Sequence, residues 1–273
     1  MRFAFCNELF KDWEIKKMAN FLAELGYQGI EIAPWVYFSS YQDFFKLDKI
    51  LSAIHDAGLE VVGLHWLFGE TSSYHITHKD QKIREKTSAY FCDLIKLCSD
   101  LQGEIMVIGS PNQRKILPGT TYQQAWNYTK AFLEQPLKVA EDLKITLCLE
   151  PLSCDQTNFI NTVDEALEFI KEINQPCLAI MADVYSLGKE EKNMEDIILT
   201  TQGYLKHFHA DDTNKKGPGA GETDFVSIGH ALTRIDFRGY VSVEVHDLTV
   251  DPRLTASRSI KYMKKCFTLD FHL

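Results

Sequence analysis

The sequence predicts an α/β fold, a single-domain (β/α)8 TIM barrel. Short apolar, β-branched segments occur eight times, and each is followed by a longer segment with helical spacing of its apolar residues. The 273 residues divided among eight such units give about 34 residues per unit, near the usual size for this barrel. No linker rich in Pro, Gly or Ser divides the chain. We therefore expect one barrel domain over residues 1–273.

The predicted strands are the eight apolar segments. They are Arg2–Cys6, Gly29–Ala33, Glu60–His65, Glu104–Ile108, Ile145–Leu149, Leu178–Ala182, Leu205–His209 and Tyr240–Val245. Functional groups of such a barrel follow the carboxyl ends of its strands. The chain contains no G-x-G-x-x-G or P-loop pattern, which disfavours a doubly wound nucleotide-binding fold.

The predicted helices are amphipathic segments whose apolar residues form one stripe, suited to pack on a sheet. They cover residues 12–25, 46–57, 80–101, 121–143, 165–173, 194–203, 224–235 and 254–267. Gly26, Gly58 and Gly103 are placed to end the first three helices. Thr162 and Glu165 form a capping box, in which each side chain satisfies a free backbone amide at the start of the fifth helix.

Composition and charge exclude several classes of protein. With 45% hydrophobic and 25% charged residues, the chain is too apolar to be disordered. A net charge of −9 disfavours nonspecific binding to nucleic acid or anionic membranes, and no apolar run approaches the roughly 20 residues of a membrane helix. The start of the chain lacks the pattern of a signal peptide. Seven cysteines without a C-x-x-C pair favour free thiols, so we expect a cytoplasmic protein.

Four polar residues end the last four predicted strands, namely Glu150, Asp183, His209 and Glu244. Adjacent strand ends converge at one mouth of the barrel, so the four side chains can meet around one ion. Three carboxylates and one imidazole form a hard site that suits Mn²⁺, with Mg²⁺, Co²⁺ or Zn²⁺ as alternatives, better than a thiolate-held structural zinc. Any one of the four is equally well explained as a helix cap or a partner of lysine. Together they favour a metal, because buried carboxylates without a cation would repel one another.

Eight short segments carry a family resemblance. They are Gly29–Ile32, Gly63–Trp66, Leu149–Leu152, Asn158–Thr162, Ala182–Asp183, His207–His209, Pro218–Phe225 and Val243–Glu244. In these segments the chain resembles the xylose isomerase-like TIM barrels, and most closely their branch of D-tagatose and D-psicose 3-epimerases. The resemblance extends over essentially the whole chain.

The resemblance implies a metal-dependent sugar isomerase or epimerase acting on a small carbohydrate, a sugar phosphate or a polyol. It implies that Glu150, Asp183, His209 and Glu244 hold the divalent ion. It also implies that Glu150 and Glu244 act as acid and base on opposite faces of the sugar, through a cis-enediolate. A metal that polarises the ketone makes the adjacent C–H acidic, and two opposed carboxylates suit inversion of that carbon.

The substrate-binding pattern of that branch is altered in this chain. Where the branch has a glutamate, a histidine and an arginine, the chain has Gln156, Ser186 and a lysine at Lys215 or Lys216. We therefore expect Gln156, Ser186 and Lys215 to contact a substrate other than a free ketohexose, such as one with an anionic group.

Two further polar residues end predicted strands near the same mouth. His65 is expected to bind a substrate hydroxyl, with a satisfied core histidine as the equal alternative. Glu31 is expected to orient His65 or contact the substrate, with a surface charge facing the helices as the alternative.

Three alternative functions stay open at this point. One is a dehydratase of the inosose dehydratase type, which also begins by removing a proton next to a carbonyl. Another is a non-catalytic binding protein with the same fold. The third is a DNA-repair hydrolase similar to endonuclease IV, disfavoured by the acidic charge and by serines at Ser110 and Ser186 where that class needs additional metal ligands. Self-association into a homo-oligomer is left open.

Overall fold

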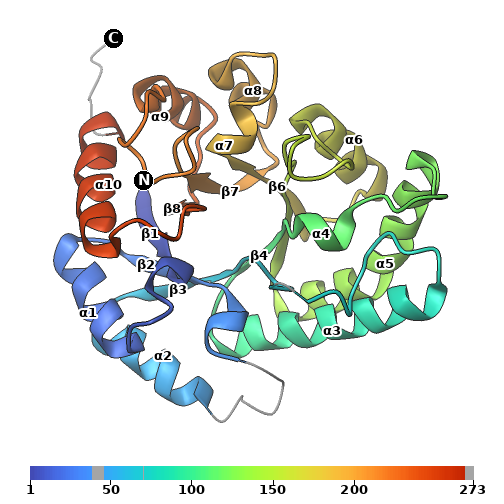
Figure 1. Ribbon diagram of the computed structural model, residues 1–273, viewed down its shortest axis with the longest axis horizontal. Coiled ribbons are helices and arrows are strands. Elements are labelled where there is room, and N and C mark those ends of the chain that lie inside the picture. The colour runs from blue at the N-terminus through green and yellow to red at the C-terminus, as the bar shows by residue number, and fades with distance from the viewer. Residues whose placement is uncertain (39–45, 70, 268–273) are drawn as a thin grey trace.

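Eight parallel strands form a closed barrel in the order of the chain, and helices surround it (Figure 1). The computed structural model describes residues 1–38, 46–69 and 71–267. The strands are β1 (Arg2–Cys6), β2 (Gly29–Ile32), β3 (Glu60–Leu64), β4 (Ile105–Ile108), β5 (Thr146–Leu149), β6 (Leu178–Asp183), β7 (Leu205–Ala210) and β8 (Tyr240–Val243). This closed barrel confirms the predicted fold class. The predicted bounds of 1–273 for the domain include residues that lie outside the described ranges.

Eight main helices follow the strands within the described residues. They are α1 (Ile15–Leu25), α2 (Leu47–Asp56), α3 (Gln81–Asp100), α5 (Tyr122–Leu143), α6 (Val163–Ile173), α8 (Met194–Thr200), α9 (Phe225–Arg234) and α10 (Pro252–Phe267). Four short elements were not predicted: η1 (Asn7–Phe10), η2 (Pro34–Val36), α4 (Pro111–Arg114) and α7 (Val184–Leu187). All four lie in loops that follow strand ends, where a single turn has too few residues for a periodic pattern.

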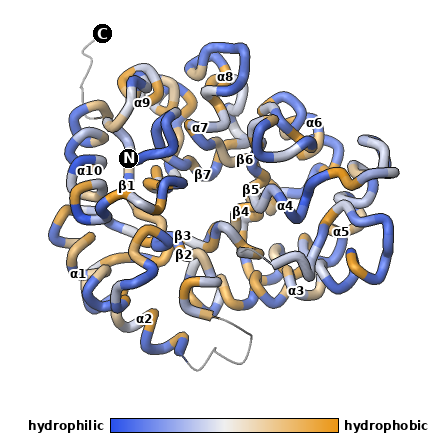
Figure 2. The backbone as a smooth tube through the Cα atoms, in the orientation of Figure 1, coloured by the Kyte–Doolittle hydropathy of each residue, from blue (hydrophilic) through white to orange (hydrophobic). Residues whose placement is uncertain are grey.

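Local sequence signals explain where the longer helices begin and end. The capping box of Thr162 and Glu165 is present at the start of α6, with both reciprocal hydrogen bonds. Gly26 ends α1 with a left-handed backbone (φ 89°), a conformation that glycine adopts without steric cost. Figure 2 shows hydrophobic and hydrophilic positions alternating along α1 and α2, as expected for helices that bury one face.

The apolar core joins the outer surface of the barrel to the inner faces of the helices. The inside of the barrel is more polar than this core. There Glu31 in β2 contacts His207 and His209 in β7 across the interior, since β2 and β7 are not neighbours in the sheet. The seven cysteines are free thiols. Within the described ranges, none of the helices combines the length and the apolar character needed to cross a bilayer.

A depression of about 680 Å³ lies at the amino ends of the strands, where its lining includes Arg2, Glu60 and Tyr240. A smaller pocket of about 140 Å³ lies at the opposite mouth. The smaller pocket is the candidate site, because it alone of these two is lined by predicted metal ligands, three of the four, and because barrel enzymes act at the carboxyl ends of their strands.

Candidate active site

The structure brings the four predicted metal ligands together at the carboxyl ends of β5 to β8. Glu150, Asp183, His209 and Glu244 each offer one ligand atom, and these atoms all lie within 4.8 Å of one another. The four residues are at most 8% exposed. Asp183 and His209 are paired in the register of β6 and β7, so regular strand pairing places their side chains side by side. The convergence predicted from strand ends is therefore present.

Glu150 is held by a close fit to the strand beside it. A Cβ atom added to Gly109, which follows β4, would lie 2.1 Å from Glu150 Oε2, so any other residue there would force this carboxylate to shift. Below it, the buried Arg114 guanidinium donates hydrogen bonds to the carbonyl oxygens of Glu150 (2.5 Å) and Ile108 (3.2 Å). A buried cation bonded to these carbonyls stiffens the backbone from which Glu150 projects.

Asp183 both caps a short helix and keeps one oxygen free for a metal ion. Its Oδ1 accepts a hydrogen bond from the Ser186 amide (2.9 Å) and caps α7. Its Oδ2 is buried and has no hydrogen-bond partner. One oxygen therefore organises the local backbone, while the other is left free to bind a cation.

His209 is oriented from inside the barrel by Glu31. The His209 Nε2 atom lies 3.1 Å from Glu31 Oε1, and Glu31 also contacts His207 Nε2 at 2.7 Å. A proton on Nε2 that faces this carboxylate leaves Nδ1 with a lone pair, and Nδ1 lies 3.0 Å from Glu244 Oε2. A carboxylate behind a histidine is the usual outer support of a metal ligand. Glu31 is 0% exposed, so the alternative of a surface charge facing the helices is wrong.

Electrostatics show a cluster with an excess of negative charge. Burial, together with Glu244 and Asp183, raises the pKa of Glu150 to about 8. Burial likewise raises the pKa of Asp183. Burial alone would also raise the pKa of Glu244, but His209 and His246 outweigh it and hold that pKa low. A divalent cation among these oxygens would offset the repulsion, and the unpartnered Asp183 Oδ2 and the hard donor set both fit such an ion.

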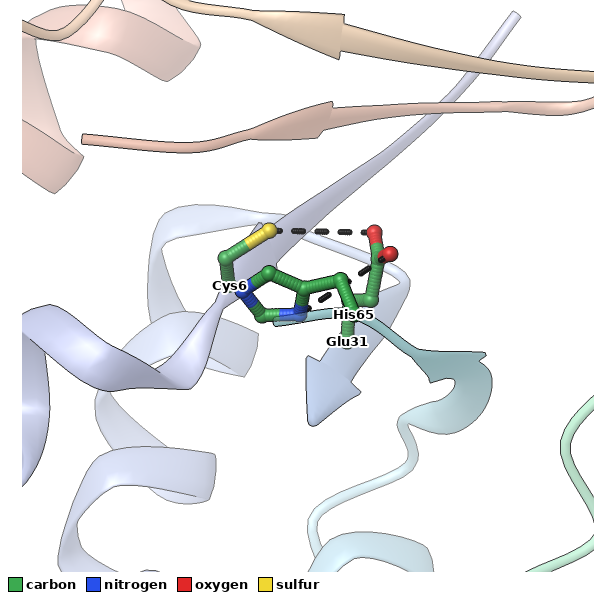
Figure 3. A group of neighbouring side chains, drawn as sticks. All are labelled: Cys6, Glu31 and His65. Carbon is green, nitrogen blue, oxygen red and sulfur yellow. Dashed lines mark hydrogen bonds and ion pairs between the residues drawn. The ribbon is translucent and has the colours of Figure 1, made fainter. Parts of the chain in front are cut away.

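A second group of polar side chains lies beneath the metal ligands. Figure 3 shows Cys6 from β1, Glu31 from β2 and His65 after β3 pointing toward one another inside the barrel. His65 Nε2 is 2.9 Å from Glu8 Oε2, and both side chains are buried. Burial alone would lower the pKa of His65, but the carboxylates of Glu8, Glu31 and Glu244 together outweigh burial and raise it to about 9.

The predicted substrate-binding residues are not all on the pocket wall. His65 and Gln156 line the pocket. Ser186 is buried and reaches the pocket through Gln156, whose Oε1 accepts a hydrogen bond from the Ser186 hydroxyl at 3.2 Å. Lys215 places its Nζ 4.7 Å from the centre of the Tyr185 ring and is absent from the lining.

Glu31 is also absent from the lining of the pocket. Ser186, Lys215 and Glu31 are thus not on the wall of this pocket, and their contact with substrate stays a prediction. The physical reason is that sequence position places a residue after a strand but does not give the direction of its side chain.

Sequence reasoning missed Glu8, His207 and Asp211 as parts of this site. Glu8 follows β1, His207 lies within β7, and Asp211 follows β7. Their signal was weak, because a single polar residue in or beside an apolar run is common. The H-x-H pattern of His207 and His209 was visible, since alternate residues of a strand share one face.

Comparison with known proteins identifies the family. Residues 19–266 match the family described as Xylose isomerase-like TIM barrel. The chain belongs to this family. Its relatives include the D-psicose 3-epimerase of Ruminiclostridium cellulolyticum, which is 27% identical over 240 residues, 86% of this chain and 80% of the relative. They also include the 3-dehydro-D-guloside 4-epimerase of Escherichia coli K12, which is 22% identical over 272 residues, 95% of this chain and 98% of the relative.

Solved structures share the fold over almost the full chain. The D-psicose 3-epimerase from Clostridium cellulolyticum H10, determined with D-tagatose, has a TM-score of 0.83 at 22% identity and covers 98% of this chain and 99% of its own. The apo 3-keto-D-glucoside 4-epimerase from Escherichia coli has a TM-score of 0.85 at 21% identity and covers 97% of this chain and 100% of its own. The named relatives support an epimerase, and the dehydratase alternative gains no support from them.

Proposed function

We propose that this protein is a divalent-metal-dependent epimerase that inverts the carbon next to the ketone of a keto sugar. The observation that carries the proposal is the buried group of Glu150, Asp183, His209 and Glu244 at the carboxyl ends of four adjacent strands. These residues would hold the ion, with Mn²⁺ as the first choice for three carboxylates and one imidazole. When bound, such an ion polarises a ketone and increases the acidity of the neighbouring C–H bond.

In the proposed reaction Glu150 and Glu244 transfer the protons. One carboxylate removes the proton from the carbon next to the ketone, so the C–H electron pair moves into an enediolate. The other carboxyl group delivers a proton to the opposite face of the same carbon. One C–H bond breaks and one forms, and the configuration is inverted without net oxidation. Both glutamates reach this pocket, from the ends of β5 and β8, which supports the assignment.

We infer that the substrate is a keto sugar with a substituent in preference to a free ketohexose. Gln156 lies on the pocket wall as a neutral group, with Ser153 Oγ donating to its Oε1 at 2.7 Å. The Escherichia coli relative that aligns along almost its whole length is named for a glycoside substrate. Because Lys215 is not on the pocket wall, the earlier expectation of an anionic substituent loses its main support. A neutral keto glycoside is the substrate class that these observations favour.

The proposal is tested by incubating metal-loaded protein in D2O with free ketohexoses and 3-keto glycosides, followed by NMR. Deuterium should appear at the inverted carbon, with faster exchange for the glycosides. Chelation should abolish exchange, and Mn²⁺, Co²⁺ or Mg²⁺ should restore it. Full exchange by metal-free protein would contradict the metal role, and equal rates with free ketohexoses would contradict the substrate class.

Variants of the two glutamates test the proton route. Glu150→Gln and Glu244→Gln should each block inversion, since each removes one acid–base group with little change of shape. Metal content must be measured for both, because a lost ion would also abolish inversion. If both variants keep their metal and invert substrate at the normal rate, the protons are transferred by other residues.

We also infer the cellular location of the protein and one class of molecule that it does not act on. The free thiols support a cytoplasmic location, and the net charge of −9 argues against nucleic acid as a substrate.

A further inference from the structure

His246 is a pocket residue whose ring faces three carboxylates. It follows β8, lines the pocket, and has a side chain that is 27% exposed. Its Nε2 atom lies 3.4 Å from Asp211 Oδ2, 3.8 Å from Glu244 Oε2 and 4.0 Å from Asp183 Oδ2. This Nε2 atom is buried and has no hydrogen bond. The buried edge of the ring therefore faces the protein, and Asp211 is its nearest partner.

Asp211 is a buried carboxylate with one free oxygen. It is 0% exposed, and its Oδ1 accepts a hydrogen bond from the Tyr185 amide at 2.9 Å. Its Oδ2 is buried without a hydrogen-bond partner. A buried carboxylate oxygen without a donor is strongly unfavourable, and the nearest ring nitrogen that can supply one is His246 Nε2. Such contacts are often long before substrate binds and shorten in the complex.

The second ring nitrogen of His246, Nδ1, lies on the edge of the ring that is not buried. Among the described residues, His246 Nδ1 makes no hydrogen bond to protein, and it is not one of the buried atoms that lack a partner. Nδ1 is therefore exposed to solvent, on a residue that lines the pocket. If Nε2 carries the proton toward Asp211, Nδ1 has a lone pair and accepts hydrogen bonds.

We propose that His246 is a substrate-binding residue whose Nδ1 accepts a hydrogen bond from a sugar hydroxyl, and that Asp211 is a positioning residue that fixes the tautomer required. The identity of the ligand as a keto sugar rests on the proposed function. The ring arrangement does not, because it follows from the contacts of Asp211 and His246 alone.

A second metal ion between Asp183, Asp211 and His246 is the competing explanation of the three unpartnered atoms. It is less favoured because Asp183 Oδ2 already belongs to the four-ligand group. A second ion would have to share Asp183 with the first, and only Asp211 and His246 would belong to it alone.

Three variants test the roles of Nε2 and Nδ1 of His246 separately. His246→Gln can place an amide near the former Nε2 and keep the contact with Asp211, but has no atom at Nδ1. His246→Asn can place an amide near Nδ1 but does not reach Asp211. Asp211→Asn presents an amide N–H toward Nε2, which favours the opposite tautomer and turns Nδ1 into a donor.

The first measurement is ¹⁵N NMR of the histidine rings in Mg²⁺-loaded protein, with His246→Gln used to assign the signal. We expect the Nε2–H tautomer in the unmodified chain and the Nδ1–H tautomer in Asp211→Asn. An Nδ1–H tautomer or a doubly protonated ring in the unmodified chain would overturn the proposal. So would two equivalents of bound Mn²⁺ that fall to one in Asp211→Asn. Neither result depends on whether the protein is an epimerase.

The second measurement is kinetic and uses the keto glycoside with the fastest exchange. His246→Gln should raise KM about three- to tenfold, the effect of one lost neutral hydrogen bond, with a smaller change in kcat. His246→Asn should retain more affinity than His246→Gln. An unchanged KM in His246→Gln, with normal metal content, would show that Nδ1 does not bind substrate. Absence of exchange with every keto sugar would instead refute the proposed function and leave the tautomer assignment standing.

Discussion

Gly109→Ala is expected to disable the site with little effect on the fold. The added Cβ would lie 2.1 Å from Glu150 Oε2, whereas such contacts essentially never fall below 3.0 Å. The carboxylate must therefore move by at least 0.9 Å, the difference between these two distances. A misplacement of about 1 Å in an active site costs on the order of 100-fold in rate. We expect a loss of kcat/KM of about that size and weaker binding of Mn²⁺.

The same substitution should leave the protein folded. Gly109 does not have the left-handed backbone that alanine avoids. Overpacking at one buried site costs about 1–3 kcal/mol. Thermal unfolding followed by circular dichroism should thus show a modest fall in Tm, while titration calorimetry shows the loss of metal affinity.

The double variant Gly109→Ala/Glu150→Asp tests whether the loss of activity in Gly109→Ala arises from the displaced Glu150 carboxylate. Glu150→Asp shortens the side chain by one methylene and removes the overlap with a Cβ at position 109. If Gly109→Ala acts through Glu150, the double variant should lose no more activity than Glu150→Asp alone. Wild-type kinetics and metal affinity in Gly109→Ala would refute this reasoning, as would fully additive losses in the double variant.

Two further predictions concern the polar residues beneath the site. Glu31→Gln should reduce metal affinity about 10- to 100-fold, measured by calorimetry, because the amide no longer fixes the ring of His209. The raised pKa of His65, about 9, means that stability from its pair with Glu8 is present below the unfolded pKa of about 6.5 and is lost as the pH rises through 9. The free energy of unfolding of chelated protein, from urea titrations, should therefore fall between pH 6.5 and 9, by up to about 1.4 kcal/mol per pH unit. Glu8→Gln should reduce this slope without abolishing it, because Glu150, whose pKa is raised to about 8, adds a fall of the same sign. An equal slope in that variant would contradict the assignment.

Strand and helix positions were largely predictable because they depend on local periodicity. All eight predicted strands are present, with ends that shift by at most two residues, as where β8 ends at Val243 and not at Val245. The capping box at Thr162 is a contact within four residues, so its sequence pattern is nearly sufficient. The short helix α7 was missed because its single turn, Val184–Leu187, is too short for a periodic pattern, although Asp183 caps its start.

The sequence by itself determined the fold and the four residues that converge at the mouth of the barrel. It could do so because strand periodicity repeats along the chain and because a closed parallel barrel brings the strand ends to one place. Only the tertiary structure decided which side chains support those four. Glu31 with His209, Glu8 with His65, and Asp211 with His246 are pairs far apart in sequence, and a contact across the barrel depends on side-chain direction, which no local pattern encodes.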